Sequence, residues 1–162
     1  MSVFLPGISA IRSVEWGSKH LWDVQFPTAP SPFNAWFPAT SVRENVYSLE
    51  RESWSLYMSS YSAVKSTGEF DLSITFVDDV KHTVLNWISH WVNTEILNGG
   101  QYVATLAESA KDVIVVRSDA EGNTVRSTTY QVIPDGSGYF EGDSSAEVNS
   151  GELALVVVGG GP

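Results

Sequence analysis

The stretch EFDLSITFVDDVKHTVLNWISHWVN, residues 69–93, decides the fold expected of this chain. Its first part alternates large apolar residues with polar ones, in the order Phe70, Asp71, Leu72, Ser73, Ile74, Thr75 and Phe76. Successive side chains of a strand point to opposite faces of the sheet. The alternation therefore predicts a strand over Phe70–Phe76 with one buried face and one wet face.

The hydrophobic period then changes from that of a strand to that of a helix. Apolar residues recur at helical spacing, namely Val80, Val84, Ile88 and Trp91, with Leu85, Trp87 and Val92 widening the stripe. We expect a helix over 80–92 that packs on the sheet through the first four of these residues. Asp78 or Asp79 should cap it, because a carboxylate accepts hydrogen bonds from the free N–H groups at a helix N-terminus and complements the helix dipole.

Composition sets the class of protein. With 162 residues, 43% of them hydrophobic, the chain should form a single globular domain over 1–162. The formal charge of −10 and the lack of a basic cluster argue against a groove that grips nucleic acid. Cysteine is absent, which excludes disulfides and thiolate metal sites. The longest apolar run, Leu153–Val158, is too short to cross a bilayer, so no membrane insertion is expected.

The other elements follow from alternation and turn residues. Strands are predicted at 20–26, 35–39, 53–62, 113–117, 124–133 and 152–158, with a weak strand at Tyr139-Phe140. Loops are predicted at 27–34, 42–52, 98–100, 119–123 and 135–150. We expect 53–62 to pair antiparallel with Phe70–Phe76, and 113–117 to be covered on both faces. An arm (1–18) and a flexible tail (159–162) flank a mainly β fold, a β-sandwich or partial barrel with one packing helix.

The order of these segments resembles a known family. LWDVQF, WFPAT, a long polar-alternating hairpin and FDLSITFVDDVKHTVLNWISHWV follow one another as in the tail-tube proteins of contractile-tailed bacteriophages, and residues 112–158 continue that order. The resemblance implies a hexameric ring in which strands of each subunit join one continuous inner barrel. Stacked rings would form a conduit for DNA ejection. The Pro-rich segment 27–34 and the Gly-rich C-terminus depart from the pattern and leave open a tail tube or a baseplate tube initiator.

The resemblance also implies partners and a location. The partners would be further copies of the chain, tail sheath and baseplate proteins, and phage DNA that passes without specific binding. The subunit would be assembled in the host cytoplasm and would reside in the virion. The arm and residues 42–62 are expected to contact neighbours in the ring, and the loops at 27–34, 98–111 and 119–123 to contact the next ring.

The resemblance assigns the polar strand faces to the lumen of such a tube. The lumen-facing residues would be Glu52, Ser53, Ser55, Ser59, Glu69, Asp71, Ser73 and Thr75. The opposite side chains, Trp54, Leu56 and Met58 among them, would pack under the helix. Acidic charge repeated around a ring would repel a phosphate backbone within a screening length of ~8 Å at physiological salt.

Two other functions compete with this interpretation. Asp78, Asp79, His82 and His90 have the chemistry of metal ligands. However, His82 and His90 are about two helical turns apart, too far for one ion, and no phosphate loop or nucleophile elbow is present. We therefore expect no enzyme activity, metal or cofactor.

The second alternative is a β-sandwich module that binds carbohydrate or protein through exposed tryptophans. Trp16, Trp36 and Trp54 are its candidates, because flat aromatic rings can carry a sugar or a partner side chain. Each sits in an apolar local pattern, which favours packing in the core or at a subunit interface.

Overall fold

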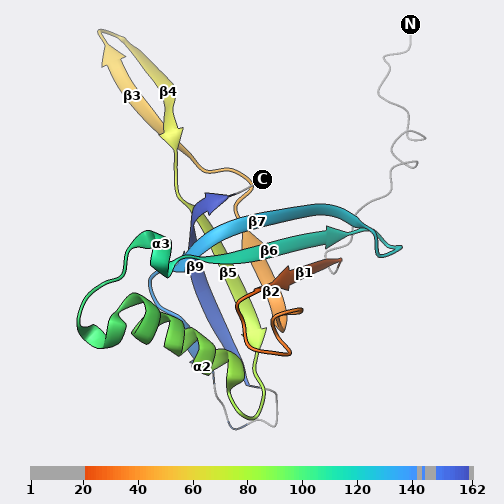
Figure 1. Cartoon of the computed structure of the whole chain (residues 1–162). Coiled ribbons are helices and arrows are strands. Elements are labelled where there is room, and N and C mark those ends of the chain that lie inside the picture. The colour runs from red at the N-terminus through yellow and green to blue at the C-terminus, as the bar shows by residue number, and fades with distance from the viewer. Residues whose placement is uncertain (1–20, 142–143, 145–148, 161–162) are drawn as a thin grey trace, which may run out of the picture.

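The computed structural model describes residues 21–141, 144 and 149–160 (Figure 1). The predicted arm at 1–18 lies outside the described residues. The strands are β1 Trp22–Gln25, β2 Ala39–Glu44, β3 Leu49–Leu56, β4 Ser59–Thr67, β5 Phe70–Val77, β6 Lys111–Ser118, β7 Thr124–Pro134, β8 Tyr139–Glu141 and β9 Ser150–Gly160. The helical segments are α2 Thr83–His90, the π-helical η1 Trp91–Ile96, the 3-10 turn η2 Asn98–Gly100 and α3 Leu106–Ser109.

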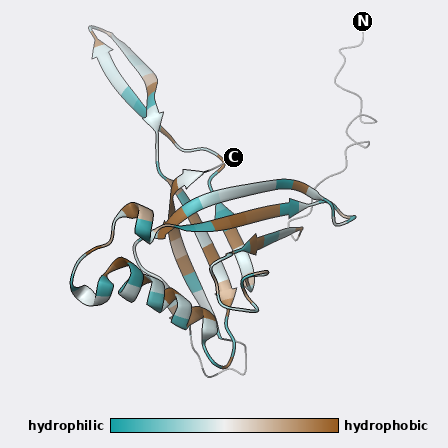
Figure 2. Cartoon of the chain, in the orientation of Figure 1, coloured by the Kyte–Doolittle hydropathy of each residue, from teal (hydrophilic) through white to brown (hydrophobic). Residues whose placement is uncertain are grey.

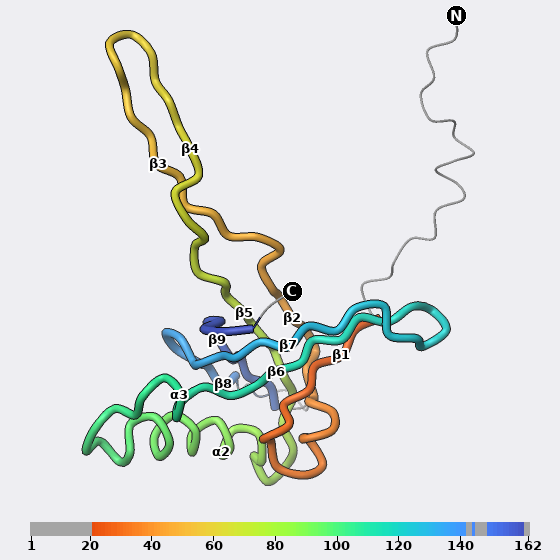
Figure 3. Tube along the Cα trace, turned by 45° about the horizontal axis from the view of Figure 1, so that its top comes forward, coloured from red at the N-terminus to blue at the C-terminus, as the bar shows by residue number. Residues whose placement is uncertain are grey.

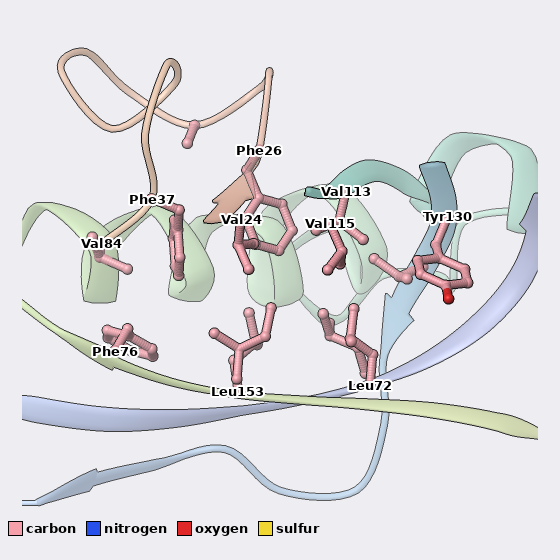
Figure 4. Close-up of a cluster of buried hydrophobic side chains, with 14 of the residues drawn as sticks. Val24, Phe26, Phe37, Leu72, Phe76, Val84, Val113, Val115, Tyr130 and Leu153 are labelled. Atoms are coloured by element: carbon pink, nitrogen blue, oxygen red, sulfur yellow. The ribbon is translucent and has the colours of Figure 1, made fainter. Parts of the chain in front are cut away.

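Within the described residues, seven strands form one antiparallel sheet. Its order is β1-β6-β7-β9-β5-β2, with β8 added to β9. The sheet curls so that its two ends approach each other, and the N–H of Phe37, just before β2, donates to the carbonyl of Val24 in β1 at 3.0 Å. The core lies inside this curl, with side chains from β5 and β9 on one side and from β1, β6, β7 and α2 on the other (Figure 4). The expected mainly β fold with a packing helix is confirmed.

Strand β5 forms as predicted, but its neighbours are different. Leu72, Ile74 and Phe76 point into the core, and the intervening side chains do not. The strand pairs with β2 and β9. The predicted pairing of 53–62 with it is wrong, because that segment folds back on itself as the β3–β4 hairpin. The turn centres on Tyr57, whose φ of 52° is left-handed, so the chain reverses without the glycine or asparagine that usually marks such a turn.

Several predicted boundaries also change. Residues 42–52 were expected to be a loop, but they include the end of β2 and the start of β3. The strand expected at 35–39 begins only at Ala39. In β6, Val113 and Val115 are buried while Ile114 and Val116 on the other face are only partly buried, so this strand is covered fully on one face and partly on the other. Strand β9 reaches Gly160 and so includes the first two residues of the expected flexible tail, while 161–162 lie outside the described residues.

The helix starts later than its hydrophobic pattern suggested. Val84 and Trp91 are buried, and Ile88 packs against the core. Val80 is 93% exposed, which corrects its assignment as a packing residue. The reason is that α2 begins only at Thr83, after a turn in which His82 takes a left-handed φ of 55°. Figure 2 shows apolar residues along the strands and helix of this body. None of the helices in the described part of the chain has the length and apolarity needed to cross a membrane.

Candidate assembly surfaces

The β3–β4 hairpin stands away from the rest of the molecule in both views (Figures 1 and 3). Every residue of its two strands is exposed. It joins the sheet through a narrow neck, residues 45–48 and 68–69, in which the Gly68 N–H donates to the Ser48 carbonyl at 2.9 Å. An isolated two-stranded hairpin is at best marginally stable in water. Among the described residues, nothing supplies this hairpin with a core.

One face of the hairpin carries hydroxyl groups. Ser53 lies directly opposite Ser62, and Ser55 lies opposite Ser60. Residues directly opposite each other in an antiparallel pair project from the same face. Arg51 belongs to this face too, since its guanidinium donates a hydrogen bond to Ser62 Oγ. We call these four serines the serine face.

The other face is largely aromatic and apolar. Trp54 lies opposite Tyr61 and stacks on it with ring centroids 6.2 Å apart, and the two residues are 47% and 50% exposed. We call the set Glu52, Trp54, Leu56, Ser59, Tyr61 and Ala63 the aromatic face. Glu52 and Ser59 were expected on the same face as Ser53 and Ser55. That grouping is wrong, because Glu52 directly precedes Ser53 and so points to the other face, and Ser59 pairs with Leu56 and shares its face.

The predicted packing of this face under the helix is also wrong. Trp54, Leu56 and Met58 are exposed on the projecting hairpin, and Figures 1 and 3 place α2 on the opposite side of the body. The helix instead covers the inner face of the seven-stranded sheet.

A second polar surface lies on the outer side of the sheet. Asp71, Ser73 and Thr75 project from β5 away from the core. Their register partners on β2 and β9 share this surface, and two of them, Ala154 and Val156, are apolar. We call its polar residues the β5 polar face: Ser41, Arg43, Asp71, Ser73, Thr75 and Glu152. Ser73 Oγ donates to Glu152 Oε1 at 3.2 Å.

The sequence did not point to Arg43 or Glu152 as members of this face, because neither the β2 nor the β9 pairing has a local signal. Arg43 lies directly opposite Ser73 and places a positive charge inside a row that was expected to be acidic. Glu69 lies outside β5. With Glu50 it lines an open hollow of about 390 Å³ where the hairpin neck meets the end of β9.

The two adjacent aspartates bind the start of α2. The Asp78 carboxylate is almost wholly buried and accepts hydrogen bonds from the N–H groups of Asp79, Val84 and Leu85 at 2.9–3.0 Å. Asp79 accepts from the Thr83 hydroxyl at 2.6 Å and from the Thr83 N–H at 2.8 Å. These two bonds lower the pKa of Asp79. The aspartates thus serve the helix from positions before its formal N-cap, His82, whose side chain makes no capping bond.

The same geometry leaves little for a metal. His82 Nδ1 is 4.0 Å from Asp78 Oδ2, and His90 is at the far end of α2. Among residues 21–141, 144 and 149–160, no three His, Asp or Glu side chains come together as a metal would require. Of the candidate platform tryptophans, Trp36 and Trp54 are half exposed and Trp16 lies outside the described residues.

Comparison with known proteins adds to this geometry. No protein-family model matches the sequence, and no curated protein matches it significantly. Solved structures do. A chain from the PVC sheath-tube complex of an extracellular contractile injection system, in the extended state, superposes with a TM-score of 0.65 at 14% identity, covering 95% of each chain. The anti-feeding prophage cap, described as the tube terminating cap, gives a TM-score of 0.65 at 13% identity over 97% of this chain and 95% of that one.

A third solved structure extends the set. The PVC sheath/tube terminator in the extended state gives a TM-score of 0.66 at 15% identity, covering 91% of this chain and 97% of that one. Each similarity spans nearly the whole of both chains, including the order of elements on which the resemblance to tail-tube proteins rests. The chain has the fold of subunits found in contractile injection systems.

Proposed function

We propose that this chain is a structural subunit of the inner tube of a contractile tail or tail-like particle. It would form the tube itself or the first rings at the baseplate. The observation that carries the proposal is the projecting hairpin, whose aromatic face has no cover among the described residues. The full-length similarity to chains from a sheath-tube complex, a tube cap and a terminator supports the same role.

In this proposal the aromatic face docks on a neighbouring copy of the chain. Burying Trp54, Leu56 and Tyr61 at an interface removes apolar surface from water, and the hairpin gains the core that it lacks alone. Pairing of hairpins and sheets around a closed ring also removes free strand edges, which otherwise invite aggregation. A six-subunit ring and stacked rings follow as parts of this proposal.

The serine face and the β5 polar face would then border the lumen. A water-filled conduit needs polar walls that do not hold what passes. The serine hydroxyls carry no charge and have one cation, Arg51, beside them, and the β5 polar face sets Asp71 and Glu152 against one cation, Arg43. Each chain carries a formal charge of −10, so a wall built from these chains would repel the phosphate backbone, and DNA would pass it without specific binding. Sheath and baseplate proteins are the proposed outer partners, the host cytoplasm the proposed site of assembly and the virion the proposed location.

The test is the oligomeric state of the purified chain and of two matched double variants. We expect the unmodified chain to form rings or tubes by light scattering and negative-stain imaging. The double variant Trp54→Ser/Tyr61→Ser should form no rings or tubes, because it removes the docking surface. The double variant Ser53→Ala/Ser62→Ala leaves that surface in place and should still form them. A chain that stays monomeric at high concentration, or rings that survive loss of both aromatics, would contradict the proposal.

A second function is favoured by one observation, the stacked and half-exposed Trp54–Tyr61 pair. Such a platform could bind a carbohydrate or a protein partner by stacking. This module would be a monomer that binds glycans or a partner protein and loses that binding in the Trp54→Ser variant. The same purified chain distinguishes the two functions, because a tube subunit loses assembly instead.

A further inference from the structure

A polar cluster of one carboxylate, one phenol and one guanidinium joins the two halves of the curled sheet where the hairpin leaves it; Glu44 and Tyr130 lie inside and Arg117 at the surface. Glu44 is the last residue of β2 and lies opposite Leu72 of β5, whose side chain is in the core. Glu44 therefore projects inward, and its side chain is only 14% exposed. An inward-pointing charge on a strand at the end of a sheet order is unusual unless other groups satisfy it.

Two strands from the other half of the sheet satisfy this carboxylate. Tyr130 Oη on β7 donates to Glu44 Oε2 at 2.7 Å, and the Arg117 guanidinium on β6 binds Glu44 Oε1. Tyr130 is itself buried in the core. Burial and then the bond to Glu44 raise the pKa of Tyr130 to about 12, so its hydroxyl keeps its proton and stays a donor.

The cluster also balances charge. Arg117 lies directly opposite Arg126 in the β6–β7 pair, a position where like charges destabilise a sheet. Glu44 supplies the anion at that place. Removing its charge would leave the two guanidiniums facing each other without an anion, and an amide in its place would accept only a weaker, neutral hydrogen bond from Tyr130.

The position of Glu44 along the chain matters for the hairpin. Four residues, 45–48, separate it from β3, and by backbone pairing β2 is joined only to β5 in the described sheet. The end of such a strand opens at a low local free-energy cost. We propose that Glu44 is a positioning residue that, held by Tyr130 and Arg117, fixes the direction in which the β3–β4 hairpin leaves the sheet.

A fixed direction has a consequence for assembly. A docking element that already points the right way loses less conformational freedom on binding, so it binds more tightly. This last step rests on the proposed function, in which the aromatic face of the hairpin docks on a second copy. The positioning itself is a property of one chain and can be measured in the monomer.

The experiment measures where the hairpin tip lies relative to the body. The chain has no cysteine, so Met58→Cys at the tip and Ser89→Cys on α2 introduce two unique sites for spin labels. The distribution of distances between the labels is recorded by double electron–electron resonance in dilute, monomeric protein. The same labelled pair is then combined with Glu44→Gln, with Tyr130→Phe, or with Glu95→Gln. The last is a matched control, since Glu95 forms an ion pair with Lys111 at 2.9 Å, outside the Glu44 cluster.

We expect Glu44→Gln and Tyr130→Phe each to give a distribution at least about twice as wide as the parent, because the end of β2 is free to open. Glu95→Gln should leave the width unchanged. A parental width in both Glu44→Gln and Tyr130→Phe would overturn the proposal, and so would equal broadening in Glu95→Gln, which would indicate general loosening. If Glu44→Gln fails to fold by circular dichroism, Tyr130→Phe decides alone, because it keeps the core ring and removes only the hydroxyl.

Assembly provides the second readout. If the unmodified chain forms rings, Glu44→Gln should raise the protein concentration needed to form them although Glu44 does not lie on the aromatic face. If the chain forms no rings, the proposed function fails while the width measurement still decides the role of Glu44.

Discussion

The body of this protein, which is the seven-stranded sheet with its helices, and the β3–β4 hairpin both have alternating apolar and polar residues, but only the body buries its apolar face. In β5, alternation buries every second side chain, and Ile74 is 0% exposed. In β3, alternation is as regular, yet Leu56 remains 57% exposed and Trp54 lies open to solvent. Alternation thus reports that one face is meant to be covered. It does not say whether the same chain or another molecule covers it.

The largest expected effect tests this difference directly. Ile74→Ala should destabilise the monomer by about 2–5 kcal/mol, because it leaves a cavity in a packed core. Leu56→Ala should change the free energy of unfolding of the monomer by less than about 0.5 kcal/mol, because that side chain has no core to lose. Chemical denaturation of both variants under monomeric conditions measures the two values.

The same pair of variants sharpens the comparison in the assembled state. Leu56→Ala should weaken ring formation although it leaves the monomer stable. Equal destabilisation of the monomer by both substitutions would mean that the hairpin packs on its own body in solution.

A smaller effect on stability is expected at the junction between β5 and α2. Asp78→Ala should cost about 2 kcal/mol, since the buried N–H groups of Val84 and Leu85 lose their acceptor. Asp135→Ala, at an exposed site, serves as the control. Thermal or chemical unfolding measures both, and equal stability of the two variants would contradict the role of Asp78 in holding α2.

Asp71→Lys should have a still smaller effect on stability, within about 0.5 kcal/mol, because Asp71 is exposed on the β5 polar face. Its predicted effect is on the passage of DNA through the lumen of the tube. In a particle that ejects DNA, a lysine repeated around each ring should retard the phosphate backbone, and ejection assays would measure this. Unchanged ejection would show that Asp71 does not line the lumen.

The smallest effect concerns pH. The Thr83 bonds lower the pKa of Asp79 below its ordinary value of 3.8, so its contribution to stability is present above that value and is lost as the pH falls through the folded-state pKa. The difference in Tm between the unmodified chain and Asp79→Asn should therefore be constant near neutral pH and shrink below about pH 4. A difference that grows in acid would have the wrong sign.

The sequence predicts best what depends on local periodicity. Strand β5, the buried helical residues Val84 and Trp91 and the capping aspartates lie within one short stretch, where side-chain spacing alone defines each face. Val80 fits the helical period but precedes a left-handed turn at His82, and no periodicity reveals that turn. The β3–β4 turn was missed for a similar reason, since Tyr57 takes a left-handed φ that its residue type does not announce.

Long-range pairing sets the limit for the candidate surfaces. Asp71, Ser73 and Thr75 could be grouped by alternation, but Glu152 joins them through a strand that is distant in sequence. The cluster of Glu44, Tyr130 and Arg117 depends on the curl that brings β2 toward β6 and β7. Glu52 is different, because it directly precedes Ser53 in the strand and alternation alone places the two side chains on different faces of the hairpin. Its assignment to the same face as Ser53 ignored that alternation.

The most direct test of the account is the exposure of the hairpin's aromatic side chains before and after assembly. Hydroxyl-radical labelling of Trp54 and Tyr61 is read by mass spectrometry in the dilute monomer and in isolated rings or tubes, with buried Trp91 as the internal reference. The account predicts that labelling of both falls from a high level in the monomer to the level of Trp91 in the particle. Labelling that stays at the monomer level in assembled particles would contradict it.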